Sequence, residues 1–143
     1  MLALPLLRRE PPALRGEYVL LRAPRHSDYL EWAALRRESR AFLEPWEPRW
    51  SDNELDREGW RRRLRRYRED FVAGTALAYL IFEKATGQMV GGITMGNIRY
   101  GVSQSAQIGY WTGERHAGRG YMQDAVRSLV THAFAAMRLH RIE

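Results

Sequence analysis

The chain has 143 residues, of which 45% are hydrophobic and 28% charged, so it can bury a core and does not have the composition of a disordered protein. It contains no cysteine, which excludes disulfides, thiolate metal sites and a cysteine nucleophile. The net charge of +6 comes almost entirely from arginine and permits an acidic partner such as nucleic acid, the ribosome or a phosphorylated cofactor.

The first residues lack the features of a secretion signal. Residues 1–7 are apolar, but no basic segment precedes them, and Arg8 and Arg9 follow where small residues should define a cleavage site. No apolar run approaches the roughly 20 residues that span a bilayer. We therefore expect a single cytoplasmic domain over residues 1–143 without membrane association, in which residues 1–16 form a flexible arm.

The N-terminal half predicts a strand followed by two helices. Residues 17–22 predict the strand, and Ser27 is an N-cap candidate for a helix over residues 28–37. Residues 42–50 are rich in proline and large aromatics, which predicts a structured loop and neither a helix nor a central strand. The second helix is predicted over residues 53–71, where apolar residues recur at helical spacing.

Three strands are predicted next. Residues 76–83 and 89–98 should pair as a hairpin across the turn at Thr86 and Gly87. Glycines at positions 91, 92 and 96 indicate bulges or close approach of another backbone. Residues 105–112 predict the third strand of this run.

The clearest element is a helix over residues 122–137, where apolar residues recur at i, i+3, i+4 and i+7 on one face. Residues 139–142 then predict the beginning of another strand. The order is strand, two helices, three strands, helix, strand. It indicates a mixed α/β (α+β) fold with the long helix packed on a sheet.

The motif that carries chemistry lies between the strand at residues 105–112 and the long helix. Residues 113–120 have the sequence Gly-Glu-Arg-His-Ala-Gly-Arg-Gly. Glycines let the backbone approach a ligand, and the first N–H groups of the helix lack intrahelical acceptors. With the helix dipole, Arg115 and Arg119, they would bind a phosphate or pyrophosphate. The alternative is a tight turn with incidental arginines, which the glycine pair alone would favour.

Two other phosphate-binding motifs do not match. A Walker loop needs a longer glycine loop that ends in Gly-Lys-Ser/Thr, and the sequence has no such run. The dinucleotide fingerprint requires a third glycine where Gln123 stands, and it requires a parallel βαβ unit that the hairpins do not supply.

The pattern Arg-x-x-Gly-x-Gly at Arg115, Gly118 and Gly120 resembles the acetyl-CoA pyrophosphate motif of the GNAT superfamily of N-acetyltransferases. This resemblance implies a mostly antiparallel twisted sheet with two N-terminal helices and a long cofactor helix. It implies acetyl-CoA as the acetyl donor and no metal. The implied cofactor-binding residues are Ile108, Gly109, Tyr110, Trp111, Arg115, His116, Ala117, Gly118, Arg119, Gly120 and Tyr121.

Further segments are similar to the ribosomal-protein-alanine N-acetyltransferase (RimJ/RimL-like) branch of that superfamily. They are residues 108–111, 117–122, 42–48 and 139–143. The branch implies a protein N-terminal amine as acceptor, such as that of a ribosomal protein, and association with the ribosome. A small-molecule amine as acceptor, or a non-catalytic module that binds acyl-CoA or the ribosome, remains an alternative.

The resemblance also implies the chemistry. A backbone N–H of the strand at residues 105–112 would polarise the thioester carbonyl, and the acceptor amine would attack it directly. Many superfamily members have a glutamate base at the position that matches Gln107, and an amide cannot take that role. Glu114 and Tyr110 are the remaining catalytic candidates, with a surface charge and a packing residue as their structural alternatives. Glu44 and Glu47 are interpreted as surface charges.

Trp46 and Asn97 are candidates for acceptor binding, although Trp46 and Trp50 could equally fill the core. The arginine-rich run at residues 61–68 suggests nucleic acid, but we favour the solvated face of an amphipathic helix and expect no sequence-specific nucleic-acid binding. The histidines show no metal-ligand spacing.

The superfamily usually continues past the strand at residues 139–142 into a helix and a hairpin, so the resemblance implies that these final elements are missing. Residues 139–142 should pair on one side with residues 105–112 and leave the other side open. Because an unpaired apolar strand edge is a template for association, we expect a homodimer or poor solubility, together with weak acetyl transfer.

Overall fold

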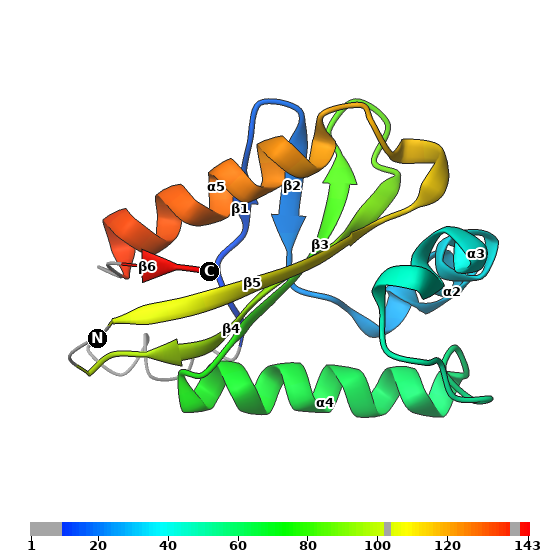
Figure 1. The fold of residues 1–143 in the computed structure, drawn as a ribbon, viewed down its shortest axis with the longest axis horizontal. Helices are drawn as coiled ribbons and strands as arrows, with labels where there is room; N and C mark the ends of the chain where they lie inside the picture. The colour runs from blue at the N-terminus through cyan, green and yellow to red at the C-terminus, as the bar shows by residue number, and fades with distance from the viewer. Residues whose placement is uncertain (1–9, 102–103, 138–140) are drawn as a thin grey trace.

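The computed structural model describes residues 10–101, 104–137 and 141–143. Within these ranges, six strands form one sheet in the order of the sequence, and each neighbouring pair is antiparallel except the last, which is parallel (Figure 1). The strands are β1 (Leu14–Arg15), β2 (Val19–Arg22), β3 (Leu77–Glu83), β4 (Met89–Arg99), β5 (Ser105–Thr112) and β6 (Arg141–Ile142). The mostly antiparallel sheet is therefore confirmed.

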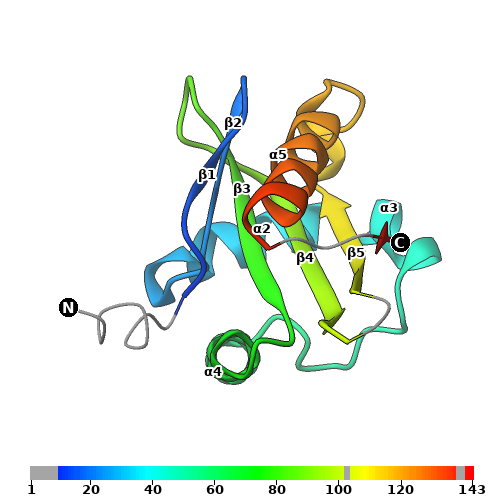
Figure 2. The same ribbon diagram turned by 90° about the vertical axis from the view of Figure 1, so that its left-hand side faces the viewer.

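Helices cover both faces of this sheet. They are α2 (Tyr29–Glu38), α3 (Arg40–Leu43), α4 (Arg57–Ala73) and α5 (Tyr121–Ala136), with the 3-10 turns η1 (His26–Asp28), η2 (Glu44–Trp46) and η3 (Glu114–His116). The long helix α5 packs on one face, and α2 and α4 pack on the other (Figures 1 and 2). None of the helices within the described ranges is long and apolar enough to cross a membrane.

Strand β3 contributes to a buried cluster on each face. Tyr79 and Ile81 belong to the cluster under α5, whereas Leu80 and Phe82 belong to the cluster under α2 and α4. Successive side chains of a strand point to opposite faces, so a strand between two helical layers must be apolar at nearly every position. This explains the continuous apolar run in β3.

The C-terminal elements lie close to their predicted positions. β5 has the predicted bounds, β3 and β4 differ from theirs by one residue at one end, and α5 differs by one residue at each end. Strand β6 pairs in parallel with Ser105 and Ala106 of β5, as expected of this segment. Residues 139 and 140 of the predicted last strand lie outside the described residues.

Part of the predicted flexible arm belongs to the sheet, so that prediction is wrong for Leu14 and Arg15. Leu14 and Arg15 pair with β2 as strand β1. The carbonyl of Pro12 accepts a hydrogen bond from the hydroxyl of Tyr79 at 2.9 Å. The prolines prevent helix here, but a residue at a sheet edge needs its backbone partner on only one side.

Helical turns occur at two places where the sequence predicted other structure. Ser27 lies inside η1 and is not an N-cap; Asp28 instead accepts the N–H of Arg25 at 2.8 Å. Residues 42–46, predicted as loop, complete α3 and form η2. Pro45 is tolerated because it stands in the first turn of η2, where a backbone N–H would have no helical acceptor.

Helix α4 begins at Arg57 and not at residue 53, because its cap is Asp56. The Asp56 carboxylate accepts the N–H of Gly59 at 2.6 Å, and Gly74, in the left-handed region at φ 78°, ends the helix. Trp60 and Leu64 are buried, so the predicted apolar face is confirmed.

Two glycines bring β4 and β5 together. A Cβ on Gly91 would stand 2.2 Å from the carbonyl oxygen of Trp111, and one on Gly92 would stand 2.4 Å from the Trp111 indole nitrogen. The predicted close approach of another backbone is therefore confirmed at Gly91, whereas Gly92 instead makes room for the Trp111 side chain. Any larger residue there would displace Trp111 and with it the strand that leads to the candidate site.

Asp124 fixes the first turn of α5 to the hairpin of β1 and β2. Its carboxylate accepts the backbone N–H groups of Glu17, Tyr18 and Val19 at 3.0, 2.8 and 3.1 Å. A side chain at Gly16 would collide with this carboxylate, because an added Cβ would stand 2.4 Å from its oxygen. Asp124 therefore sets where the N-terminus of α5 lies relative to the sheet.

Candidate donor site and acceptor cleft

The segment between β5 and α5, residues 113–121, forms a donor cradle. It begins at Gly113, which donates its N–H to the carbonyl of Val90 at 2.9 Å. A Cβ on Gly113 would stand 2.5 Å from a methyl carbon of Leu35 in α2. Next, Glu114 donates its N–H to the buried hydroxyl of Ser39 at 3.0 Å. The start of the cradle is thus held by both the sheet and α2.

The second half of the cradle has the conformation of an anion site. Gly118 and Gly120 have φ of 75° and 83°, a region that side chains disfavour, and nothing lies within 4 Å of where their Cβ atoms would be. No side chain caps α5, whose first hydrogen bond runs from the N–H of Asp124 to the carbonyl of Gly120. The first N–H groups of the helix therefore lack intrahelical acceptors and a side-chain cap, and they adjoin the open space beside the two glycines, which fits a pyrophosphate.

The two predicted arginines of the cradle differ. Arg115 forms an ion pair with Glu38 of α2 at 2.9 Å, with both side chains substantially exposed. Arg119 is exposed beside the two glycines. An exposed pair contributes little stability, so the guanidinium of Arg115 can exchange Glu38 for a phosphate at small cost.

His116 is the buried side chain of the cradle. It is 6% exposed, its Nε2 has no hydrogen-bond partner among the described residues, and its ring lies edge-on to Tyr121 with centroids 6.2 Å apart. Burial lowers the pKa of His116, and the positive charges of Arg115 and Arg119 lower it further. The imidazole is therefore a neutral packing group near neutral pH.

Tyr121, the first residue of α5, is tied to β3. Its hydroxyl donates to the carboxylate of Glu83, which also accepts from the hydroxyl of Thr86 at 2.6 Å. These hydrogen bonds, first that of Thr86 and then that of Tyr121, lower the pKa of Glu83. A carboxylate that stays ionised keeps the helix start fixed at the end of the sheet.

The outer edge of β5 offers backbone groups to a ligand. The N–H of Ile108 donates to the carbonyl of Glu143 at 2.6 Å, so Ile108 points its backbone groups outward. Backbone groups alternate sides along a strand, and Tyr110 therefore points outward too. In the ranges that the structure describes, no strand pairs with β5 at Tyr110 on this side. An amide-bearing chain could hydrogen-bond there as an added strand.

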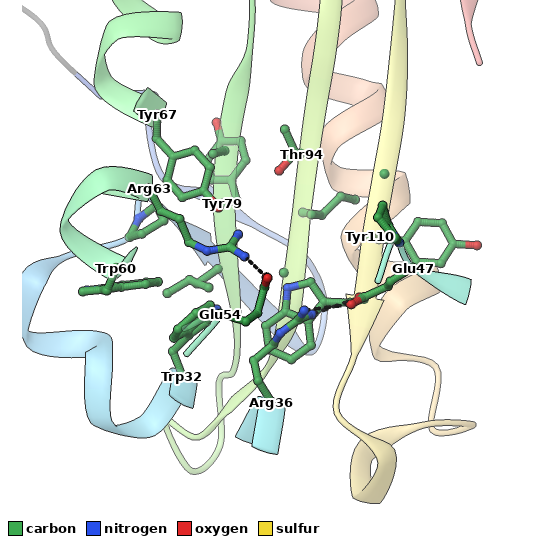
Figure 3. Close-up of a pocket in the computed structure, with 18 of the residues that line it drawn as sticks. Trp32, Arg36, Glu47, Glu54, Trp60, Arg63, Tyr67, Tyr79, Thr94 and Tyr110 are labelled. Carbon is green, nitrogen blue, oxygen red and sulfur yellow. Dashed lines mark hydrogen bonds and ion pairs between the residues drawn. The ribbon is translucent and has the colours of Figure 1, made fainter. Parts of the chain in front are cut away.

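A cleft of about 390 Å³ opens between α2, α4 and strands β3 to β5 (Figure 3). Gly109, Tyr110 and Trp111 of β5 line it, so the strand that leads to the cradle is also a wall of the cleft. Several aromatic side chains and two arginine–carboxylate pairs form the remaining walls. We call this the acceptor cleft.

The first ion pair connects α2 to the segment after η2. Arg36 is buried and holds Glu47 through two hydrogen bonds of 3.0 and 2.8 Å, and the indole N–H of Trp50 donates to Glu47 at 2.8 Å. The guanidinium lies 4.7 Å from the ring of Trp50 and 4.8 Å from that of Trp111, so two indoles contact it. The interpretation of Glu47 as a surface charge is therefore wrong.

The predicted catalytic and acceptor-binding residues are dispersed. Tyr110 is 62% exposed at the cleft, and Glu114 is exposed in the cradle. Trp46 is 84% exposed and does not line the acceptor cleft, whereas the buried Trp50 does. Asn97 donates from its side-chain amide to Gln107 at 2.6 Å, away from the cleft lining. The roles of these residues remain predictions.

Sequence reasoning missed Arg36, Glu54 and Asp124 as site residues. Each is paired with a group outside its own element, Glu54 with Arg63 of α4 and the others as described above. In the sequence, the only signal for such a buried pairing is a charged residue at a core-facing position of a helix. Arg36 and Asp124 stand at such positions. That signal indicates burial but not the partner.

Comparisons with known proteins identify the family to which this fold belongs. The profile of the acetyltransferase (GNAT) domain family matches residues 19–143. The probable N-acetyltransferase YjcK of Bacillus subtilis is 32% identical over 130 residues, which are 91% of this chain and 72% of that protein. The ribosomal protein uS5-alanine N-acetyltransferase of Escherichia coli is 28% identical over 105 residues, which are 73% of this chain and 54% of that protein.

Among solved structures, RimJ of Mycobacterium smegmatis in complex with CoA-disulfide has a TM-score of 0.82 and 32% identity. The match covers 92% of this chain and 64% of that one. The chain thus spans just over half of the Escherichia coli relative and just under two thirds of the Mycobacterium smegmatis structure.

Proposed function

The chain belongs to the acetyltransferase (GNAT) domain family and is an acetyltransferase, and from this premise we propose that it transfers an acetyl group from acetyl-CoA to the N-terminal amine of a protein, such as a ribosomal protein. The observation that carries the proposal is the double role of β5. Its residues 109–111 line the acceptor cleft, and the strand runs directly into the cradle. Donor and acceptor would meet at this strand.

The donor would be held mainly by backbone. The uncapped start of α5 and the open positions beside Gly118 and Gly120 suit the pyrophosphate, and Arg115 and Arg119 would add charge. Ile108, Gly109, Tyr110 and Trp111 would hold the amide-bearing arm along the edge of β5. When bound, acetyl-CoA would supply the acetyl group in an activated thioester, whose C–S bond breaks as the amine forms the amide bond, so that CoA leaves as the thiol. The remaining cradle residues, His116, Ala117 and Tyr121, would shape the site around these contacts.

The protein's own part in the reaction is positioning and charge stabilisation. The outward N–H of Tyr110 is the donor that would polarise the acetyl carbonyl, because it lies on the edge of β5 that has no strand partner among the described residues. Glu114, exposed in the cradle, is the carboxylate that could take the amine proton through water. Gln107 cannot do so, and its amide already accepts from Asn97.

Two observations support a polypeptide acceptor. The acceptor cleft is open and lined by aromatic rings and ion pairs, a surface that can contact an extended chain. The Escherichia coli relative is a ribosomal protein uS5-alanine N-acetyltransferase. A ribosomal acceptor would place the reaction in the cytoplasm and bring the enzyme to the ribosome.

The test measures acetyl transfer from acetyl-CoA to a panel of peptides and small amines. Release of the CoA thiol gives the rate, and mass spectrometry locates the acetyl group. Peptides with a free N-terminal alanine or serine should be acetylated at the α-amine, and the same peptides with a blocked N-terminus should not. Transfer confined to small amines or to lysine side chains would contradict the proposal.

The pH profile of kcat/KM then tests the base. If Glu114 relays the proton, the profile should show a titration below the pKa of the acceptor amine, and E114Q should remove it. If only the amine titrates in both proteins, Glu114 has no such role.

A further inference from the structure

A second hollow, of about 280 Å³, adjoins the acceptor cleft along α4. The two share Glu54, Arg63 and Tyr67 in their linings, so the ion pair of Arg63 with Glu54 borders both. The second hollow is further lined by Ser51, Asn53, Arg62 and Arg66. We call it the arginine hollow. An acceptor chain that leaves the cleft on this side would pass through it.

The charge of the hollow is positive. Helix α4 carries seven arginines and three acidic residues. Arg63 is neutralised by Glu54, but Arg62 approaches its own acidic neighbour Glu58 only at 3.9 Å in an exposed pair. Arg66 forms no ion pair with any described residue. Arg62 and Arg66 are one helical turn apart and therefore lie on the same side of the helix. Two guanidinium groups are therefore available on one side of the helix.

Polar groups beside these arginines can donate as well. The hydroxyl of Ser51 donates to the side-chain oxygen of Asn53 at 2.8 Å, which leaves the N–H groups of the Asn53 amide as donors. Guanidinium and amide donors together match the acceptor oxygens of a carboxylate. The hollow therefore suits an anionic side chain.

We propose that the arginine hollow is a specificity subsite that binds an acidic side chain of the acceptor polypeptide, a few residues after the amine that is acetylated. This inference rests on the proposed function, because the acceptor must be a chain that extends beyond the acceptor cleft. A protein is favoured over nucleic acid because the hollow is small and adjoins the acceptor cleft, whereas a nucleic-acid backbone needs a row of phosphate contacts.

The experiment compares two peptides that differ only in carrying two glutamates or two glutamines at positions three to six. Their binding to the full chain in the presence of CoA is measured by calorimetry, and their kcat/KM by acetyl transfer. The wild type should bind the acidic peptide about tenfold more tightly, as two charge-assisted contacts allow. In R62Q/R66Q the two peptides should bind equally.

The matched control is R61Q/R65Q, which removes the same charge from the same helix at two residues that do not line the hollow. It should keep most of the preference for the acidic peptide. An equal loss in both double variants would overturn the subsite, because it would show a general effect of net charge. A preference that persists in R62Q/R66Q would overturn it as well.

Two further outcomes are decisive. The inference would be overturned if a single-stranded RNA bound more tightly than the acidic peptide and R62Q/R66Q abolished that RNA binding. The hollow would then be a nucleic-acid site. If no peptide is acetylated, the proposed function fails, but calorimetry still decides the subsite: selective binding of the acidic peptide supports it, and equal or no binding refutes it. The two failures are therefore distinguishable.

Discussion

The donor cradle and the acceptor cleft share strand β5 but are built on different principles. The cradle is one continuous segment whose useful groups are backbone N–H groups and two glycines of positive φ. The cleft is assembled from α2, α4, three strands and the segment after η2, and ion-paired and aromatic side chains form much of its wall. Donor binding at the cradle, as proposed, would therefore depend mainly on backbone conformation, whereas acceptor binding at the cleft would depend on its side chains.

This difference predicts how each region fails. The cradle should tolerate most changes in its side chains but not a change in its backbone conformation. In the cleft, the loss of one charged partner should reduce function and stability more than a change in the backbone of a loop, because a charge left alone in a buried site is costly. Four predictions separate these cases.

The largest effect is expected in the cradle. Gly118→Glu or Gly120→Glu should reduce acetyl-CoA affinity below detection, because each forces a side chain into φ near 75–83° and adds a negative charge at the anion site. Calorimetry with CoA measures this loss, and circular dichroism shows whether the variant is folded.

Gly87→Glu is the matched control for this effect. Gly87 also has positive φ, at 77°, and has open space around its Cβ position, but it lies in the turn between β3 and β4. It should lose about 1 kcal/mol of stability and keep its affinity for CoA. A folded Gly118→Glu protein with unchanged affinity would remove the cradle from the donor site.

The second effect is expected in the cleft. Arg36→Met leaves Glu47 without its bidentate partner and removes the cation between Trp50 and Trp111. The Glu47 side chain is partly exposed, so we expect a loss of about 2–3 kcal/mol in the free energy of unfolding. The KM for acceptor should rise more than the Kd for CoA.

Arg40→Met serves as the control, since Arg40 also lies over Trp50 but its pair with Glu44 is exposed. Its loss should stay below about 1 kcal/mol by urea denaturation. Equal losses in the two variants would mean that the Arg36 pair is no more than a surface contact.

The third effect tests whether the cradle depends on its anchor. Asp124→Asn removes one of the two oxygens that accept three backbone N–H groups of the hairpin, and its NH₂ group faces those donors. We expect a loss of about 2 kcal/mol in stability. The affinity for CoA should fall only a few-fold, because the helix start itself is intact. A loss of CoA binding without a loss of stability would show that Asp124 acts on the ligand directly.

The same contrast explains what the sequence could predict. The cradle could be predicted from residues 113–120, because their glycines, their arginines and the following helix are adjacent in the chain. The strands and α5 were predictable for a similar reason, since hydrophobic periodicity is local. The acceptor cleft was not, because Arg36, Glu47 and Trp111 come from segments whose meeting depends on the whole sheet. The short β1 was also missed, since two residues carry no periodicity.

The smallest effect concerns His116 and the pH dependence of stability. Burial lowers the pKa of His116, Arg115 and Arg119 lower it further, and Glu83 and Glu38 oppose this. Below the ordinary histidine pKa the unfolded chain binds a proton that the folded chain does not. His116 therefore favours the folded state fully above about pH 6.5, and this contribution is lost as the pH falls from there through its lowered pKa.

We therefore expect H116Q to lose less stability than the wild type when urea denaturation is compared at pH 7.5 and pH 5.5. His132 of α5 is the control, because burial lowers its pKa too, but it lies outside the cradle. H132Q should reduce the pH dependence of stability by the contribution of His132 and leave CoA affinity unchanged. H116Q should also weaken CoA binding, because it removes the buried His116 ring that packs against Tyr121 within the cradle. If H116Q and the wild type lost stability in parallel, His116 would be protonated with equal ease in both states, and its buried ring would not be the neutral support that the cradle requires.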